Sequence, residues 1–228
     1  MPDLPAFDFT PYRLSGTVYG ALLNDPLALA ALGEAVHRPP YKAPPKSPVL
    51  CVKPRNTLAR NGDTLRMPAL CKALVVGASL GLVIGRTACR VRAADARDFI
   101  AGYTIVNDVS VAHDNFYRPS IRCNARDGFC PIGPHVLPAS ALRDPDALPV
   151  CIYLDDDVAQ ITSTSGRIRP MAELLAAVTD FMTLQPGDIL TLGASAGAPH
   201  ARAGQLIAID IPGLGRLENR VVAEEAVP

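Results

Sequence analysis

The sequence predicts an α+β fold that is mainly β, a twisted and rolled mixed sheet with a few short helices. Proline and glycine give the first indication: 22 prolines and 17 glycines are spaced along the 228 residues, as is typical of short strands joined by tight turns. Short apolar runs recur between these turns, and few segments carry apolar residues at helical spacing. A helical bundle is therefore disfavoured.

Three helices are expected. The segment 26–36 has Pro26 at a first helical position and leucines at helical spacing, which predicts a short helix. The segment 91–103 predicts a helix of about two turns that ends at Gly102. The segment 170–184 places its apolar residues on one face and predicts the longest of the three.

Strands are expected between these helices. Prolines exclude regular structure from the segment 38–48, because each fixes φ and lacks an N–H group. The expected strands cover residues 49–53, 75–87, 104–111, 148–156, 188–193 and 205–215. No internal repeat or linker divides them. Residues 1–17 are therefore expected to be an N-terminal extension and residues 18–228 a single domain.

The composition limits which ligands the protein is expected to bind and where in the cell it is expected to act. Lysine plus arginine and aspartate plus glutamate number 22 each, and no basic cluster suggests nucleic acid or anionic lipid. No apolar run approaches the roughly 18 residues that span a bilayer, and no secretory signal is visible, so we expect a cytoplasmic protein without a membrane partner. The six cysteines form no CxxC pair, which argues against a zinc knuckle or a disulfide framework.

Four segments depart from generic core sequence. They are KPRNTL at 53–58, GYTIVNDVS at 102–110, FYRPSIRCNARDGFCPIGP at 116–134 and LQPGDILTLGASAG at 184–197. Their order and spacing resemble the fumarylacetoacetate hydrolase family, over nearly the whole chain. The resemblance implies a mixed β-sandwich roll of the fumarylacetoacetate hydrolase C-terminal-domain type, a bound Mg²⁺ or Mn²⁺ ion, and 2-oxo acid substrates.

Within the family, the KPRNT, FYRP and RDGFCPIGP segments are most similar to the bifunctional isomerase/decarboxylases of 4-hydroxyphenylacetate (homoprotocatechuate) degradation. The likeness is to their N-terminal half, or to the small subunit that replaces that half in some bacteria. It implies a role in decarboxylation of 5-carboxymethyl-2-oxo-hex-3-ene-1,7-dioate and isomerisation of 2-hydroxyhepta-2,4-diene-1,7-dioate. The expected ligand is a small 2-oxo dicarboxylate.

The metal ligands that the resemblance implies are largely missing. The family places Glu-x-Glu on one strand, where alternation puts both carboxylates on one face, and adds the aspartate of the NDVS segment. Asp108 matches that aspartate, whereas the two glutamates fall on Gly77 and Ser79. One carboxylate holds Mg²⁺ poorly, so we expect metal binding to be weak or absent.

A polar set remains that could line a dicarboxylate pocket, since arginine suits carboxylates geometrically. Its members are Lys53, Tyr117, Arg118, Arg126 and Asp127. The alternative interpretation is structural: Lys53 extends along apolar surface, Asp127 orders the DGF turn, and the arginines form ion pairs.

Other positions of the family pattern are changed as well. The lysine three residues before the DGF aspartate falls on Asn124, so its charge is lost. The His-x-x-Glu pair of the family's lid helix, which activates water in its hydrolases, falls on Ala28 and Ala31. His113 is the histidine nearest a site motif, and a solvated surface role is favoured over that of a base.

Three functional hypotheses follow. The favoured one is a non-catalytic partner of a homologous, metal-bearing subunit within an isomerase/decarboxylase, as a homodimer or hetero-oligomer. The second is an isomerase/decarboxylase that is complete in itself, which the missing glutamate pair weakens. The third, a metal-dependent acylpyruvate hydrolase, is least favoured because Ala28 and Ala31 replace the lid dyad.

Overall fold

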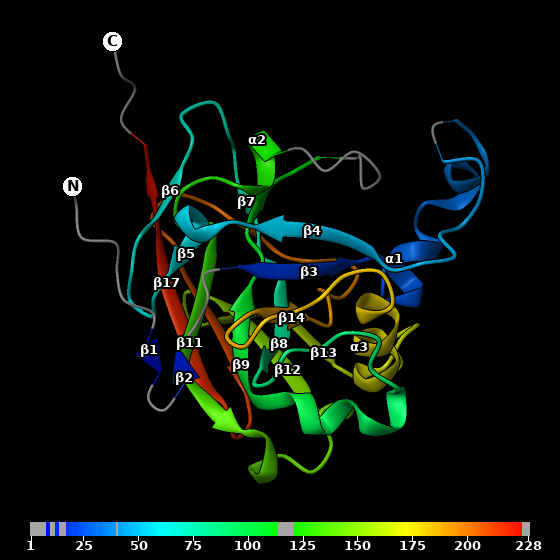
Figure 1. Ribbon diagram of the computed structural model, residues 1–228. Helices are drawn as coiled ribbons and strands as arrows, with labels where there is room; N and C mark the ends of the chain where they lie inside the picture. The colour runs from blue at the N-terminus through cyan, green and yellow to red at the C-terminus, as the bar shows by residue number, and fades with distance from the viewer. Residues whose placement is uncertain (1–7, 10–11, 14–16, 40, 114–120, 225–228) are drawn as a thin grey trace.

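The structure is a computed structural model, and it describes residues 8–9, 12–13, 17–39, 41–113 and 121–224 (Figure 1). Two large sheets form its centre, and a curled, mainly β architecture with few helices results, as predicted. Each sheet brings together strands that are far apart in the sequence (Figure 1).

The larger sheet has seven strands. In spatial order they are β4 (Val49–Lys53), β3 (Val18–Leu22), β14 (Ile189–Thr191), β8 (Ala78–Ile84), β9 (Ile100–Asn107), β11 (Cys130–Pro138) and β5 (Leu58–Ala59). The pairs β14·β3 and β11·β5 are parallel, and the other neighbours are antiparallel. The sheet is therefore mixed.

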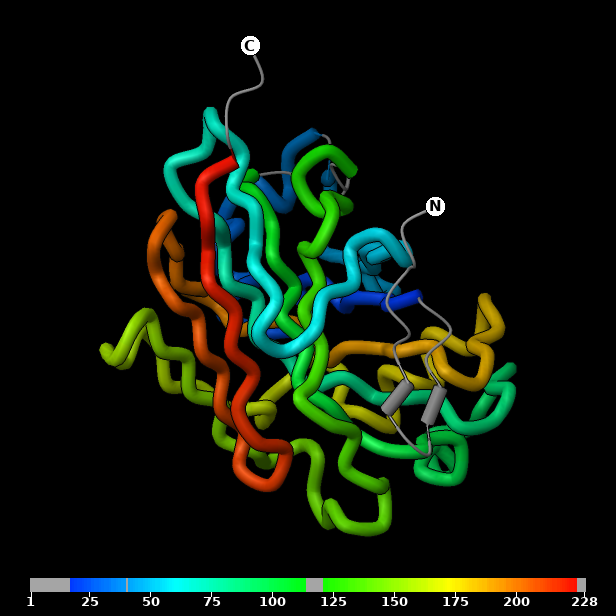
Figure 2. The backbone as a smooth tube through the Cα atoms, turned by 90° about the vertical axis from the view of Figure 1, so that its left-hand side faces the viewer, coloured from blue at the N-terminus to red at the C-terminus, as the bar shows by residue number. Residues whose placement is uncertain are grey.

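The second sheet has five strands. Their spatial order is β13 (Asp157–Ser163), β12 (Pro149–Leu154), β16 (Leu206–Ile211), β17 (Gly215–Ala223) and β6 (Leu65–Met67). Figure 2 shows the C-terminal strand β17, in red, beside the much earlier β6 in cyan, and the two are parallel. A short three-stranded sheet of β10 (Ser110–Val111), β7 (Leu74–Val75) and β15 (His200–Ala201) lies near the site described below. The strands β1 (Asp8–Phe9) and β2 (Tyr12–Arg13) form a separate two-stranded sheet.

The position of strand β8 explains why residues 78–84 are mainly apolar. All seven of its residues are buried. Leu80 and Leu82 belong to the main core, and Val83 on the alternate face packs in a second cluster with Val106 and Ile132. A strand that is covered on both faces needs a continuous apolar run rather than alternation, which explains the segment ASLGLVI.

The helices are shorter than the sequence predicted. The segment 26–36 divides into α1 (Pro26–Ala30) and a 3₁₀ helix over Gly33–His37, and Gly33 has a φ of +49° at the break. Helix α3 (Met171–Thr179) ends before residue 184. A four-residue helix, α2 (Ile121–Asn124), precedes the DGF turn.

The prediction of an α-helix over 91–103 that ends at Gly102 was wrong in the type of helix and in the residue at which it ends. A 3₁₀ helix covers Ala93–Phe99, and Gly102 lies inside β9. A Cβ on Gly102 would lie 2.4 Å from the carbonyl oxygen of Leu137 on β11. Gly102 therefore permits close pairing of two strands instead of ending a helix. Further 3₁₀ turns cover Arg55–Thr57 and Ala139–Ala141.

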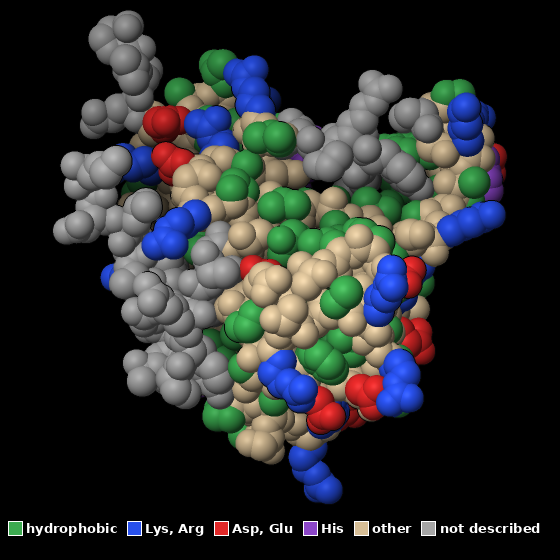
Figure 3. All heavy atoms as spheres, in the orientation of Figure 1, with side chains coloured by type: hydrophobic (Ala, Val, Ile, Leu, Met, Phe, Trp, Pro, Cys, Tyr) green, Lys and Arg blue, Asp and Glu red, His purple; other side chains and the backbone are tan. Residues whose placement is uncertain are grey.

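Surface character varies over the molecule. Figure 3 shows hydrophobic and neutral side chains over the centre of one face, with charged groups gathered toward its edges. Within the described part of the chain, no helix has the length and apolar character needed to cross a bilayer.

Candidate functional site

The centre of the site is an ion pair between Lys53, at the end of β4, and Asp108, which directly follows β9. Lys53 Nζ lies 2.7 Å from Asp108 Oδ1, and the lysine is fully buried. The same ammonium donates to the carbonyl oxygens of Val109, Asn124 and Phe129 at 2.6, 2.8 and 3.1 Å. Its charge is thus shared among four oxygens, which ties β4 to the residues after β9 and to the segment from α2 to the DGF turn.

The second oxygen of Asp108 faces a thiol. Cys51 Sγ lies 3.5 Å from Asp108 Oδ2. Burial, followed by the nearby Asp108 carboxylate, raises the pKa of Cys51 well above its usual value. Burial likewise raises the pKa of Cys130 to about 12. Burial therefore favours the protonated form of both thiols, which disfavours nucleophilic attack by either sulfur.

The structure brings Gly77 directly against Asp108. The Asp108 N–H donates to the Gly77 carbonyl oxygen at 2.9 Å, and the Gly77 N–H donates to Asn107 Oδ1 at 3.1 Å. A Cβ on Gly77 would lie 2.4 Å from the backbone oxygen of Asp108. This position therefore lacks a carboxylate and also lacks the space for any side chain.

Ser79 lies two residues farther along, on β8, and is buried. Its Oγ accepts the N–H of Gly193 at 3.0 Å and donates to the Leu80 carbonyl oxygen at 3.3 Å. The hydroxyl is therefore occupied in joining β8 to the turn after β14.

These residues do not fit a divalent cation. Mg²⁺ and Mn²⁺ favour several oxygen ligands with a net negative charge. Asp108 is already neutralised by Lys53, Gly77 has no side chain, and Ser79 is engaged with backbone groups. Nowhere among the described residues do three His, Cys, Asp or Glu side chains form a group that could hold a metal ion.

A cavity of about 630 Å³ opens beside the ion pair. Gly77, Asp108 and Asn124 line it, together with His113 and His200. His113 was expected on the solvated surface, but it is partly buried in this lining, with Nδ1 3.0 Å from the Val111 carbonyl oxygen. Ala28 and Ala31, at the positions of the lid dyad, also line the cavity and contribute only methyl groups.

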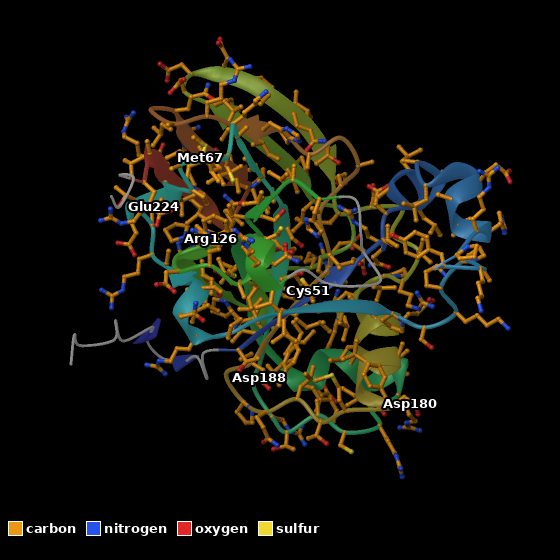
Figure 4. All side chains as sticks on the ribbon, turned by 90° about the horizontal axis from the view of Figure 1, so that it is seen from above. Cys51, Met67, Arg126, Asp180, Asp188 and Glu224 are labelled. Atoms are coloured by element: carbon orange, nitrogen blue, oxygen red, sulfur yellow. The ribbon has the colours of Figure 1, made fainter. Side chains whose placement is uncertain are left out.

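The described members of the predicted substrate-binding set, Lys53, Arg126 and Asp127, lie outside the cavity lining. Lys53 is buried and does not line the cavity. Arg126 Nη2 lies 3.2 Å from Glu224 Oε2 and its guanidinium stands over the Phe129 ring, while Asp127 accepts a hydrogen bond from Asn56 at 2.7 Å. Figure 4 shows Arg126 beside Glu224, on the opposite side of the molecule from the helices after β3. Tyr117 and Arg118 lie outside the described residues.

A second buried ion pair, which the sequence did not reveal, contacts two residues of the cavity lining, Ser195 and Ala196. Arg167 Nη1 lies 3.1 Å from Asp25 Oδ2, and both side chains are largely buried. Asp25 also caps α1 by accepting the N–H of Leu27 at 2.7 Å, and it accepts the Ala196 N–H at 3.3 Å. An aspartate before a proline at a helix start is a recognisable capping signal, but no local pattern links it to an arginine 142 residues away.

Comparisons with known proteins show the family to which the chain belongs. Residues 17–222 match the family described as fumarylacetoacetate (FAA) hydrolase C-terminal. A 4-hydroxyphenylacetate degradation bifunctional isomerase/decarboxylase from Salmonella dublin is 41% identical over 212 residues, which are 93% of this chain and 48% of that protein. An Escherichia coli protein of the same description is 40% identical over 94% of this chain and 49% of its own length. The chain thus spans about half the length of these curated relatives.

Solved structures of similar fold lead to the same family. A 5-carboxymethyl-2-hydroxymuconate delta-isomerase from Mycobacterium smegmatis has a TM-score of 0.79 and 28% identity, over 93% of this chain and 81% of its own. A maleylpyruvate hydrolase from Sphingobium sp. SYK-6, in complex with manganese(II) and pyruvate, has a TM-score of 0.75 and 25% identity, over 92% and 71%. From sequence and fold alike, this chain belongs to the fumarylacetoacetate hydrolase family.

Proposed function

We propose that this chain is a subunit of an isomerase/decarboxylase of 4-hydroxyphenylacetate degradation and that it acts there as the partner of a metal-bearing homologue. The names of its curated relatives support the pathway, and their length supports a second unit, because the chain corresponds to about half of each. The assembly that we propose is cytoplasmic, in keeping with six unpaired cysteines.

One observation carries the assignment of the partner role. The single carboxylate at the expected metal position, Asp108, is 2.7 Å from a buried ammonium, and Gly77 is closed against its backbone. A divalent cation would have to displace Lys53 from four oxygen contacts without gaining a second carboxylate. Binding of the ion and of the 2-oxo dicarboxylate substrate is therefore assigned to the homologous subunit.

A complete enzyme and a hydrolase receive less support. The described cavity contains neither a pair of acidic ligands nor the water-activating dyad, since Ala28 and Ala31 occupy the dyad's positions. The hydrolases among the structural neighbours support the common fold.

A metal titration tests the partner role. Calorimetry with MnCl₂ on the purified chain should show no saturable binding at micromolar concentration, and Asp108→Asn should behave in the same way. Micromolar binding by the wild type that Asp108→Asn abolishes would overturn the assignment.

An activity assay tests the pathway. The chain alone should not decarboxylate 5-carboxymethyl-2-oxo-hex-3-ene-1,7-dioate, whereas a mixture with a metal-bearing homologue from the same source should be more active than the homologue alone. Full activity of the isolated chain would refute the partner role. No effect of the chain on a homologue that it binds would refute a functional role in the complex.

A further inference from the structure

The turn between β5 and β6 contains an Asn-Gly pair, Asn61–Gly62, which is the one such pair in the sequence. Gly62 has a φ of +88°, and the Asp63 N–H donates to the Arg60 carbonyl oxygen at 3.2 Å, so residues 60–63 form a β-turn. Asn61 and Gly62 are both exposed. The pair is therefore within reach of water.

An Asn-Gly pair can modify itself covalently. The Gly62 backbone nitrogen, once it has lost its proton to a base in solution, attacks Asn61 Cγ; the N–Cγ bond forms, the Cγ–Nδ2 bond breaks and ammonia leaves. Water then opens the resulting cyclic imide at either carbonyl, which gives aspartate or isoaspartate. The overall change replaces an amide by a carboxylate, consumes one water molecule and involves no oxidation or reduction. Glycine favours this reaction because it has no side chain to hinder ring closure.

The fold holds both reacting groups against β17. The Gly62 N–H donates to the Glu218 carbonyl oxygen at 2.8 Å, and the Glu218 N–H donates to Asn61 Oδ1 at 2.7 Å. The proton that must leave first is thus engaged in a hydrogen bond, and the side chain that it must make way for is held by another. Ring closure therefore requires the contact between Gly62 and Glu218 to open.

A buried side chain on β17 clamps the same turn. Asn219 is 1% exposed, and its Nδ2 donates to the carbonyl oxygens of Arg60 and Asp63 at 2.8 and 2.9 Å. These oxygens belong to the first and last residues of the turn. Asn219 therefore holds the turn on β17 through the residues on either side of the Asn-Gly pair.

We propose that Asn61 is a site of spontaneous deamidation that β17 keeps closed, and that the reaction proceeds only when the turn detaches from Glu218 and Asn219. The rate of modification then follows the local opening of this turn rather than the exposure of Asn61. The proposal concerns the chemical stability of the chain, so it can fail while the proposed function stands.

Peptide mass spectrometry after incubation at mildly alkaline pH tests the protection. In the folded full chain, Asn61 should deamidate at least about tenfold more slowly than in the same chain unfolded in guanidinium chloride. Equal rates in the two states would overturn the proposal.

Two matched variants test the clamp. Asn219→Ala removes two hydrogen bonds and should raise the deamidation rate of Asn61 in the folded chain about tenfold. Asn24→Ala is the control, because Asn24 is also buried and its Nδ2 also donates to two carbonyl oxygens, those of Arg169 and Leu192, which are not part of this turn. It should leave the rate close to that of the wild type. An unchanged rate in Asn219→Ala, or equal acceleration by both variants, would contradict the assigned clamp.

Amide hydrogen exchange followed by NMR needs no variant. The Gly62 amide should exchange at least about tenfold more slowly in the folded wild type than in the unfolded chain, because its proton is bonded to Glu218. Exchange at the unfolded rate would overturn the proposal even if Asn219→Ala does not fold.

Discussion

Lys53 is the residue that makes most of the polar contacts at the centre of the site. Its sequence motif marked it as a substrate contact or a structural residue, and the structure buries it among four oxygens. The resemblance placed Gly77 and Asp108 at one metal position, but it did not pair Asp108 with Lys53. Their contacts depend on β4, β8 and β9 lying in one region, and spacing along a chain does not encode that arrangement. Likewise, the resemblance to the family indicated that a glutamate is missing at position 77. It did not indicate that the Asp108 backbone fills the space that a side chain at this position would need.

Replacement of Lys53 should be severe. Lys53→Met removes the partner of a partly buried carboxylate and leaves three carbonyl oxygens without their donor, so we expect a loss of about 3–5 kcal/mol in the free energy of unfolding. Urea denaturation followed by circular dichroism measures this loss. Lys72→Met, at an exposed lysine, is the matched control and should leave the midpoint nearly unchanged. Equal midpoints for the two variants would show that the buried pair contributes no stability.

At the scale of elements, α1 depends on its tertiary contacts. A helix of five residues is too short to be stable alone. Asp25 holds its first turn and joins it to Arg167 and to the segment after β14. Sequence periodicity predicted one helix over 26–36, but the positive φ of Gly33 interrupts it. The start of α1 was predictable from the sequence, because Asp25 before Pro26 is a capping signal. The position of α1 in the fold depends on the distant Arg167, which the sequence did not indicate.

The contribution of this connection can be measured by comparing two aspartates. Asp25→Ala removes the cap and leaves Arg167, whose side chain is 3% exposed, without its counter-ion, so the free energy of unfolding should fall by about 3–5 kcal/mol. Asp95→Ala breaks the exposed pair with Arg92 and serves as the control, with little change expected. Thermal unfolding of both variants gives the comparison. A loss for Asp25→Ala no greater than that for Asp95→Ala would mean that the buried pair does not hold α1.

At the scale of the whole molecule, stability comes from the core that joins the sheets. Strand β8 contributes to both apolar clusters, so its side chains are decisive. The sequence revealed this strand by its continuous apolar run. Strand order was not predictable, because β3 meets β14 and β6 meets β17 across most of the chain. Pairings at such separation follow from the completed packing rather than from any local signal.

Replacing one buried and one exposed leucine tests how much burial in the core contributes to stability. Leu82→Ala, at a fully buried position of β8, should lower the free energy of unfolding by about 2–5 kcal/mol through the cavity that it creates. Leu70→Ala, at a side chain that is 95% exposed, should have almost no effect. Urea midpoints with an unchanged denaturant dependence would confirm the expected contrast, and a similar loss for both would contradict it.

The place of β14 between β3 and β8 also governs when this protein can fold during its synthesis. Residues 18–22 are synthesised well before residues 189–191, which form one of their two neighbours in the sheet. Until then the middle of the larger sheet is open on two edges. A nascent chain arrested near residue 180 should therefore remain sensitive to protease, and the native sheet should close only after residues 189–191 have been made.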